Sequence, residues 1–204
     1  MWFALATFVP AAMVIILVPG PDTLLVLRSI VRGGRPHGWA TAVGVLTGIA
    51  VWVCAAALGL AALLRASEVV YDVLRIAGAA YLVCLGLMSL RSLARKDPVA
   101  HPERTSIIGT GYGAGLVTNL LNPKVGVFFV TFLPGFVPHG DPVGPTSLLF
   151  GAVFLALSVG YFVALISSAA RLTRWLRTPR IRRRLDAVAG AILIGFGVRL
   201  GTET

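Results

Sequence analysis

Two ionisable side chains stand inside long apolar stretches, and each follows a proline motif. Asp22 ends the run Pro-Gly-Pro-Asp at residues 19–22, and Lys124 ends the run Asn-Pro-Lys at residues 122–124. An ionised group in apolar surroundings needs a charged or polar partner, so both are candidates for binding ions or charged substrates. An acid and a base together suit a small zwitterion, whose ammonium would face Asp22 and whose carboxylate would face Lys124. Asp22 is also a candidate to carry a coupling proton.

The first motif predicts an interrupted helix. Pro19 and Pro21 lack backbone N–H donors, and Gly20 between them has low helix propensity. One interpretation is a tolerated kink. The other is a second half-helix that begins at Pro21 and points its free N–H groups into a cavity, with Asp22 in its first turn, where the helix dipole favours a carboxylate.

The second motif predicts a similar interruption with the opposite charge. Asn122 can cap a helix and Pro123 suits its first position, so Lys124 falls in the first turn, where the dipole disfavours a cation. We expect Lys124 either to snorkel to a membrane interface or to form an anion site for Asp22 or a substrate carboxylate. Asn119 lies one turn before Asn122 on the same helix face. Its side chain can form a hydrogen bond to the first broken helix or to the substrate. Asp22 and Lys124 count toward opposite membrane faces, so whether they meet stays open.

The composition indicates that lipid surrounds most of the chain. Of its 204 residues, 57% are hydrophobic and only 13% are charged, with a mean hydropathy of +0.87. This leaves too little polar surface to cover a water-soluble core. The formal net charge of +10 would suit nucleic acid, but the Lys and Arg residues form no basic face and do not alternate with aromatic residues. A nucleic-acid partner is therefore not expected.

Six apolar stretches approach the length of about 20 residues that crosses a bilayer. They cover residues 2–27, 39–64, 69–90, 107–137, 147–170 and 185–200. Basic residues gather in the first, third and fifth connections: Arg28, Arg32 and Arg35; Arg91, Arg95, Lys96 and Arg104; and Arg171, Arg174, Arg177, Arg180, Arg182, Arg183 and Arg184. The positive-inside rule places these connections in the cytoplasm and both termini outside.

The predicted fold is an all-α integral membrane protein with about six transmembrane helices. Residues 1–204 form a single transmembrane transporter domain, with a first repeat over about 1–91, a linker over about 92–106 and a second repeat over about 107–204. Three helices per repeat give the two repeats opposite orientations. Each repeat begins with a broken helix, which is the layout of an inverted-repeat transporter.

Two further features have local interpretations. Gly44 with Gly48 and Gly111 with Gly115 are small-xxx-small pairs, which predict close contacts between helices. Arg75 lies near the start of the third stretch, in a stripe of acidic and basic residues along the predicted helix. It either snorkels to the interface or pairs locally, or else serves as an external gate.

Several of these motifs together resemble the LysE/RhtB family of amino-acid exporters. They are PGPD at 19–22, the glycines Gly44 and Gly48, RIAGAAYLVCLG at 75–86, NLLNPKVGVFF at 119–129 and LPGF at 133–136. The resemblance extends from the first predicted helix through the fourth. It implies export of amino acids or related amines from a bacterial cytoplasm across the inner membrane, energised by the proton gradient, by a protein that often forms oligomers.

The predicted function is therefore secondary active export of amino acids, or of closely related small zwitterions or amines, by alternating access and proton antiport. One acid and one base suit a net-neutral zwitterion better than a dication. A passive channel and a membrane-embedded enzyme are the alternatives. An enzyme would need a nucleophile, a metal cluster or paired acids, and no such pattern is present, so no cofactor or metal is expected. The family resemblance also makes a homo-oligomer a possible assembly.

Overall fold

The computed structural model describes residues 1–66, 109–138 and 140–168, together with single residues between 73 and 90 and between 187 and 198. All regular structure in these residues is helical, which confirms the all-α prediction for this part of the chain. The third and sixth predicted spans fall outside the continuous ranges, and Arg75 lies outside the described residues. The inverted three-helix repeats therefore remain a prediction.

A proline break separates the first two helices, α1 (Trp2–Leu17) and α2 (Pro21–Ala66). Val18 is held extended, with φ −67° and ψ 114°, because the ring of Pro19 disfavours helical geometry in the residue before it. Pro21 then opens α2, where a missing N–H removes no helical hydrogen bond. The first predicted span is thus two helices.

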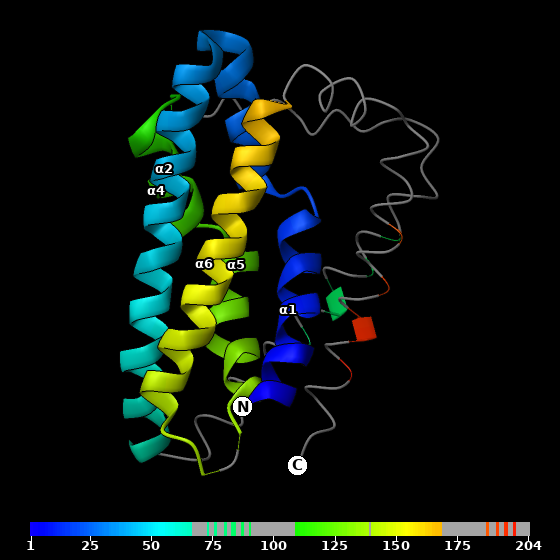
Figure 1. Ribbon diagram of the computed structural model, residues 1–204, viewed down its shortest axis with the longest axis vertical. Helices are drawn as coiled ribbons and strands as arrows, with labels where there is room; N and C mark the ends of the chain where they lie inside the picture. The colour runs from blue at the N-terminus through cyan, green and yellow to red at the C-terminus, as the bar shows by residue number, and fades with distance from the viewer. Residues whose placement is uncertain are drawn as a thin grey trace.

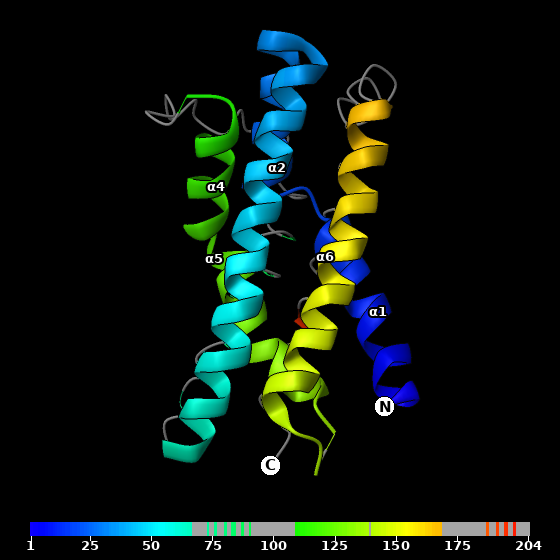
Figure 2. The ribbon, with the colours of Figure 1, turned by 60° about the vertical axis from the view of Figure 1, so that its left-hand side comes forward.

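Helix α2 folds back on itself (Figures 1 and 2). Gly33 and Gly34 leave helical geometry, and Gly34 has φ 73°, a conformation that glycine adopts at little cost. Across the reversal, the Thr41 hydroxyl donates to the Ser29 hydroxyl at 2.8 Å. Helix α2 therefore contains the end of the first predicted span, the first basic connection and the second span.

The fourth predicted span is also broken. Its parts are α4 (Tyr112–Leu120), α5 (Pro123–Val127), the π-helix η1 (Phe128–Phe132) and the 3-10 helix η2 (Leu133–Phe136). Asn122 is extended ahead of Pro123, with φ −78° and ψ 105°, so the same steric effect acts here as at Val18. The segment after the break is bent by 52° from α4.

Helix α6 (Val143–Ser167) begins a few residues before the predicted span at 147–170. Among the described residues, Pro21–Gly59 and Val143–Ser167 are long and apolar enough to cross a membrane. The bent pair of α4 with the segment from α5 to η2 makes a third candidate.

Glycines bring α2 and α4 into direct backbone contact. A β-carbon on Gly44 would collide with the carbonyl oxygen of Tyr112, and one on Gly115 would collide with that of Thr41. Only a residue without a side chain lets two helices approach this closely. Gly44, Gly48 and Gly115 thus make the close helix contacts that the sequence predicts, whereas nothing lies within 4 Å of a β-carbon added to Gly111.

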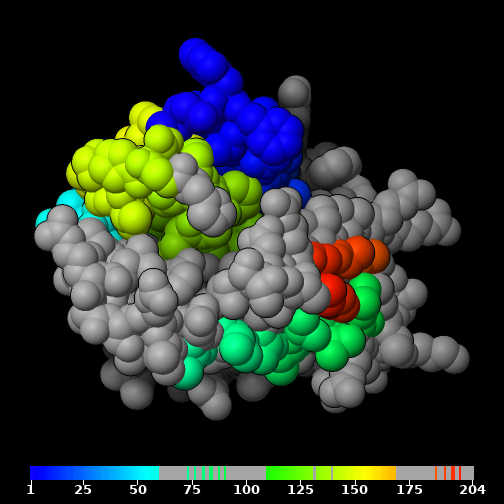
Figure 3. Space-filling model, turned by 90° about the horizontal axis from the view of Figure 1, so that it is seen from below, coloured from blue at the N-terminus to red at the C-terminus, as the bar shows by residue number. Residues whose placement is uncertain are grey.

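The bundle has two distinct ends. At the fold-back end, Arg35 Nη2 donates to the carbonyl oxygen of Ser167 at 3.0 Å, and the N–H of Gly111 donates to Thr41 Oγ1 at 3.0 Å. This end therefore gathers the reversal of α2, the start of α4 and the end of α6 (Figure 1). At the N-terminal end, the first residues of the chain lie beside those that lead into α6 (Figure 3).

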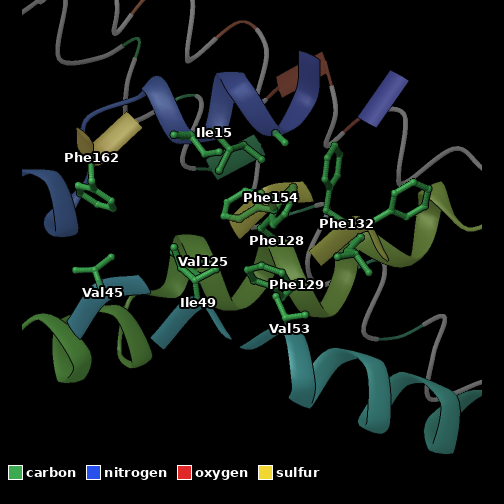
Figure 4. Packing of buried hydrophobic residues seen from close by; sticks show 14 of the residues in the cluster. Ile15, Val45, Ile49, Val53, Val125, Phe128, Phe129, Phe132, Phe154 and Phe162 are labelled. Carbon is green, nitrogen blue, oxygen red and sulfur yellow. The ribbon is translucent and has the colours of Figure 1, made fainter. Parts of the chain in front are cut away.

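Phenylalanine rings fill the core toward the N-terminal end. We define the aromatic cluster as Phe8, Phe128, Phe129, Phe132, Phe136, Phe150 and Phe154. Phe8 of α1 stacks on Phe150 of α6 with ring centroids 4.9 Å apart, and Phe128 of η1 lies 4.7 Å from Phe154. Figure 4 shows several of these side chains converging between the helices. The cluster joins α1, η1, η2 and α6.

Candidate functional site

The two helix breaks meet, and four side chains lie where they do. We call Asp22, Asn119, Asn122 and Lys124 the break site. Asp22 comes from the first turn of α2, Asn119 from the last turn of α4, Asn122 from the second break and Lys124 from the first turn of α5. The sequence placed Asn119 and Asn122 on one face and left open whether Asp22 and Lys124 meet, and the structure brings all four residues together.

Lys124 binds the carbonyl end of α1. Its Nζ donates to the backbone oxygens of Ile15 and Val18, at 2.6 Å and 2.9 Å. The oxygen of Ile15 has no helical donor because Pro19, four residues on, lacks an N–H. The lysine side chain crosses the break at Gly20, where an added β-carbon would lie 3.9 Å from Nζ. Pro19 thus creates the acceptor that Lys124 occupies.

This contact reverses the electrostatic problem that the sequence posed. Counted within its own helix, Lys124 stands at an N-terminus, where the dipole disfavours a cation. In the fold, its ammonium reaches the C-terminus of α1, where partial negative charge gathers and a cation is favourable. Lys124 at the second break therefore stabilises the C-terminus of α1 at the first break.

Asp22 is buried, and its two oxygens have different surroundings. Oδ2 accepts hydrogen bonds from the side-chain amides of Asn119 at 2.8 Å and Asn122 at 3.0 Å. Oδ1 has no hydrogen-bond partner among the described residues. An unpaired buried carboxylate oxygen is costly, so this atom is where a proton or a cationic ligand group would be stabilised most.

Asn122 connects the two charged residues. Its Nδ2 donates to Asp22, while its Oδ1 accepts the backbone N–H of Lys124 at 3.1 Å and so caps α5. Within the described part of the chain, no ion pair joins the Asp22 carboxylate to the Lys124 ammonium. Asp22 and Lys124 therefore belong to one site and are connected through Asn122, but their charged groups bind different partners.

Close packing fixes the position of Asn119. A β-carbon on Gly48 would lie 2.5 Å from Asn119 Oδ1, and the indole N–H of Trp52 donates to the Asn119 carbonyl oxygen at 3.4 Å. The same indole packs against Gly126, where a β-carbon would meet it at 3.1 Å. The middle of α2 thus holds both sides of the second break, which keeps the Asn119 and Asn122 amides aimed at one carboxylate.

A further polar contact lies next to Asp22, and no sequence pattern predicts it. Thr23 Oγ1 and Tyr161 OH lie 3.1 Å apart, joining the first turn of α2 to α6. Thr23 is adjacent to Asp22 and buried, and Tyr161 is half-buried. The residues are 138 positions apart, so no local spacing pattern could pair them.

Apolar helices and a buried polar cluster at two helix breaks are typical of one class: a membrane protein whose irregular backbone lies inside the protein, away from lipid. Comparison with known proteins specifies the family. The model of the LysE type translocator family matches residues 13–204, and the chain belongs to this family. The resemblance seen in the sequence is confirmed, and the chain is a transporter and not an enzyme.

Named relatives cover nearly the whole chain. An uncharacterized membrane protein of Pseudomonas aeruginosa is 38% identical over 97% of this chain and 94% of its own length. A leucine efflux protein of Enterobacter sp. (strain 638) is 36% identical, over 96% of this chain and 94% of its own. A leucine efflux protein of Salmonella choleraesuis is 31% identical, over 96% and 93%. No solved structure matches the chain.

Proposed function

We propose that this protein exports amino acids across the bacterial inner membrane, and that small neutral amino acids such as leucine are its substrates. The family is one of translocators, and two of its named relatives are leucine efflux proteins. The site supports a net-neutral substrate, because it contains one carboxylate and one ammonium group.

Asp22 is the observation that carries this proposal. It is the only buried acid among the described residues, and one of its oxygens has no hydrogen-bond partner there. A substrate ammonium group can donate to that oxygen while the amides of Asn119 and Asn122 keep the other oxygen in place. Asp22 is therefore the proposed ammonium site.

The same carboxylate supports proton coupling. One Asp22 oxygen cannot hold a proton and accept from a substrate ammonium group at once, so the two ligands compete. Competition at one site is the simplest basis for antiport, in which an inward proton replaces an outward substrate. In this proposal Asp22 takes up a proton after it releases the amino acid outside.

The contacts between the breaks support alternating access by two inverted repeats within one domain. Asp22 of the first repeat binds amides of the second, and Lys124 of the second binds the α1 carbonyl oxygens of the first. Motion of one repeat against the other would change both sets of contacts. We propose that the fold-back end is cytoplasmic, that both termini are outside, and that the aromatic cluster closes the outer side in this state.

A transport assay with purified protein tests the proposal. Liposomes containing the protein and a high internal concentration of unlabelled leucine should accumulate labelled leucine by counterflow, and an inward proton gradient should accelerate efflux. Empty liposomes give the background. A passive channel would show flux without saturation or counterflow, and failure with leucine and other neutral amino acids would reject amino-acid export.

A further inference from the structure

The hydroxyl pair of Thr23 and Tyr161 has a donor to spare. The two oxygens lie 3.1 Å apart, and either can be the donor of their shared bond. Each hydroxyl carries one hydrogen, so a single mutual bond uses one of the two. In the described part of the chain this is the only side-chain hydrogen bond that either residue makes. Whichever hydroxyl donates, the hydrogen of the other is available to an acceptor.

The donor groups of the break site are already held by contacts within it. The Lys124 ammonium donates to two backbone oxygens of α1, and the amides of Asn119 and Asn122 donate to Asp22, which leaves one hydrogen on each of these three nitrogens. Moving Lys124 to a substrate would leave the oxygens of Ile15 and Val18 without their donor, which is costly in an apolar environment. The hydroxyl pair lies outside these contacts and can bind a carboxylate without breaking them.

We propose that Thr23 and Tyr161 bind the carboxylate of the amino-acid substrate while Asp22 binds its ammonium group. This inference rests on the proposed function and deepens it. Asp22 and Thr23 are neighbours in the first turn of α2, and an α-amino acid carries its two charged groups on one carbon. The first N–H groups of α2 face the same end of the helix, where the dipole favours a carboxylate. Asp22 also points to a ligand here, because its Oδ1 has no hydrogen-bond partner among the described residues and the residue is only 9% exposed.

This assignment gives the protein a means of selecting amino acids over amines. The hydroxyl pair contributes binding energy only to a substrate that carries a carboxylate, whereas Asp22 serves any primary ammonium group. Lys124 then has a structural role only. Its ammonium group binds the α1 carbonyl oxygens, and the hydroxyl pair binds the substrate carboxylate.

Counterflow kinetics with two ligands test the proposal. Labelled leucine reports the KM, and leucinamide, which keeps the ammonium group but lacks the carboxylate, serves as a competitor. In Tyr161→Phe and in Thr23→Val, the KM for leucine should rise about tenfold, as expected for a lost hydrogen bond to a charged group. The inhibition constant of leucinamide should not change. Thr23→Ser keeps a hydroxyl and should behave like the unmodified protein.

Other results would overturn the inference in recognisable ways. An unchanged KM for leucine in both variants would show that the hydroxyls do not touch the substrate. An equal rise in the KM for leucine and in the inhibition constant of leucinamide would show that the hydroxyl pair only supports the fold. The thermal unfolding temperature in detergent would then fall as well. Absence of counterflow with leucine and with other neutral amino acids in the unmodified protein is a different result, because it rejects the proposed function itself.

Discussion

The break site and the aromatic cluster are built on the same elements, yet they differ in what fills them. Helix α1 contributes carbonyl oxygens to the break site and Phe8 to the aromatic cluster. The segment from α5 to η1 contributes Lys124 to the break site and Phe128 to the aromatic cluster. In the described part of the chain, the break site holds charges, amides and two buried oxygens without a hydrogen-bond partner, Asp22 Oδ1 and Asn119 Oδ1, while the cluster holds only packed rings. One region is suited to exchanging ligands and the other to excluding water.

The contrast between the break site and the aromatic cluster explains how a polar site can exist inside an apolar helix bundle. The first proline break releases backbone oxygens that lipid cannot satisfy, and Lys124 at the second break supplies their donor. At the second break, Trp52 of α2 donates to the Asn119 oxygen, whose usual α-helical donor is missing because Pro123 has no N–H. The ring packing then needs no hydrogen bonds and can close one side of the site. Substitutions in each region separate these two roles.

The largest effect is expected in the aromatic cluster. Phe128 is fully buried against Phe8 and Phe154, so Phe128→Ala should lower the free energy of unfolding by about 3–5 kcal/mol. Phe3→Ala is the matched control, because the Phe3 side chain is 83% exposed and its loss leaves no cavity. Reversible unfolding in mixed micelles measures both. Equal losses would mean that the cluster is not a packed core.

Lys124 provides the corresponding test in the break site. Lys124→Met removes the donor to Ile15 and Val18 and should lower the free energy of unfolding by about 2–4 kcal/mol, because two backbone oxygens lose a charged partner. Lys124→Arg keeps a cationic donor and should recover much of this loss. If the methionine variant unfolds like the unmodified protein, Lys124 does not cap α1.

A smaller effect is expected where α2 and α4 touch. Gly115→Ala places a methyl group against the Thr41 carbonyl oxygen and should destabilise by about 1–3 kcal/mol through overpacking. Gly113→Ala lies in the same helix with nothing within 4 Å of its added β-carbon, so it should be neutral or slightly stabilising. Thermal unfolding of the pair measures the contact. A Gly113 variant that is as unstable as the Gly115 variant would argue against it.

Local chemistry allowed much of this to be predicted from the sequence. Proline removes a donor and restrains the residue before it wherever it occurs, so both interruptions follow from residues 19–21 and from Pro123. The spacing of Asn119 and Asn122 placed both amides on one face. The approach of α2 to α4 followed from glycines four residues apart.

Long-range docking explains what could not be predicted. Lys124 contacts Ile15, which is 109 residues away, and the Thr23 to Tyr161 bond spans 138 residues. Neither contact leaves a local pattern, because it depends on how the helices pack. The dipole argument failed for Lys124 for the same reason: it considered the helix that carries the lysine and not the helix that receives its ammonium group.

Leucine counterflow by the Asp22→Asn variant tests whether the substrate binds at the break site. Asparagine keeps the size of the side chain and removes the charge, so counterflow should fall by about 10–100-fold, as expected when an ammonium group loses its charged acceptor. Asp141→Asn makes the same change in the connection before α6 and should leave counterflow intact. Loss of activity in Asp22→Asn alone is the predicted result. Full counterflow by a correctly folded Asp22→Asn variant would contradict the assignment of the break site as the substrate site.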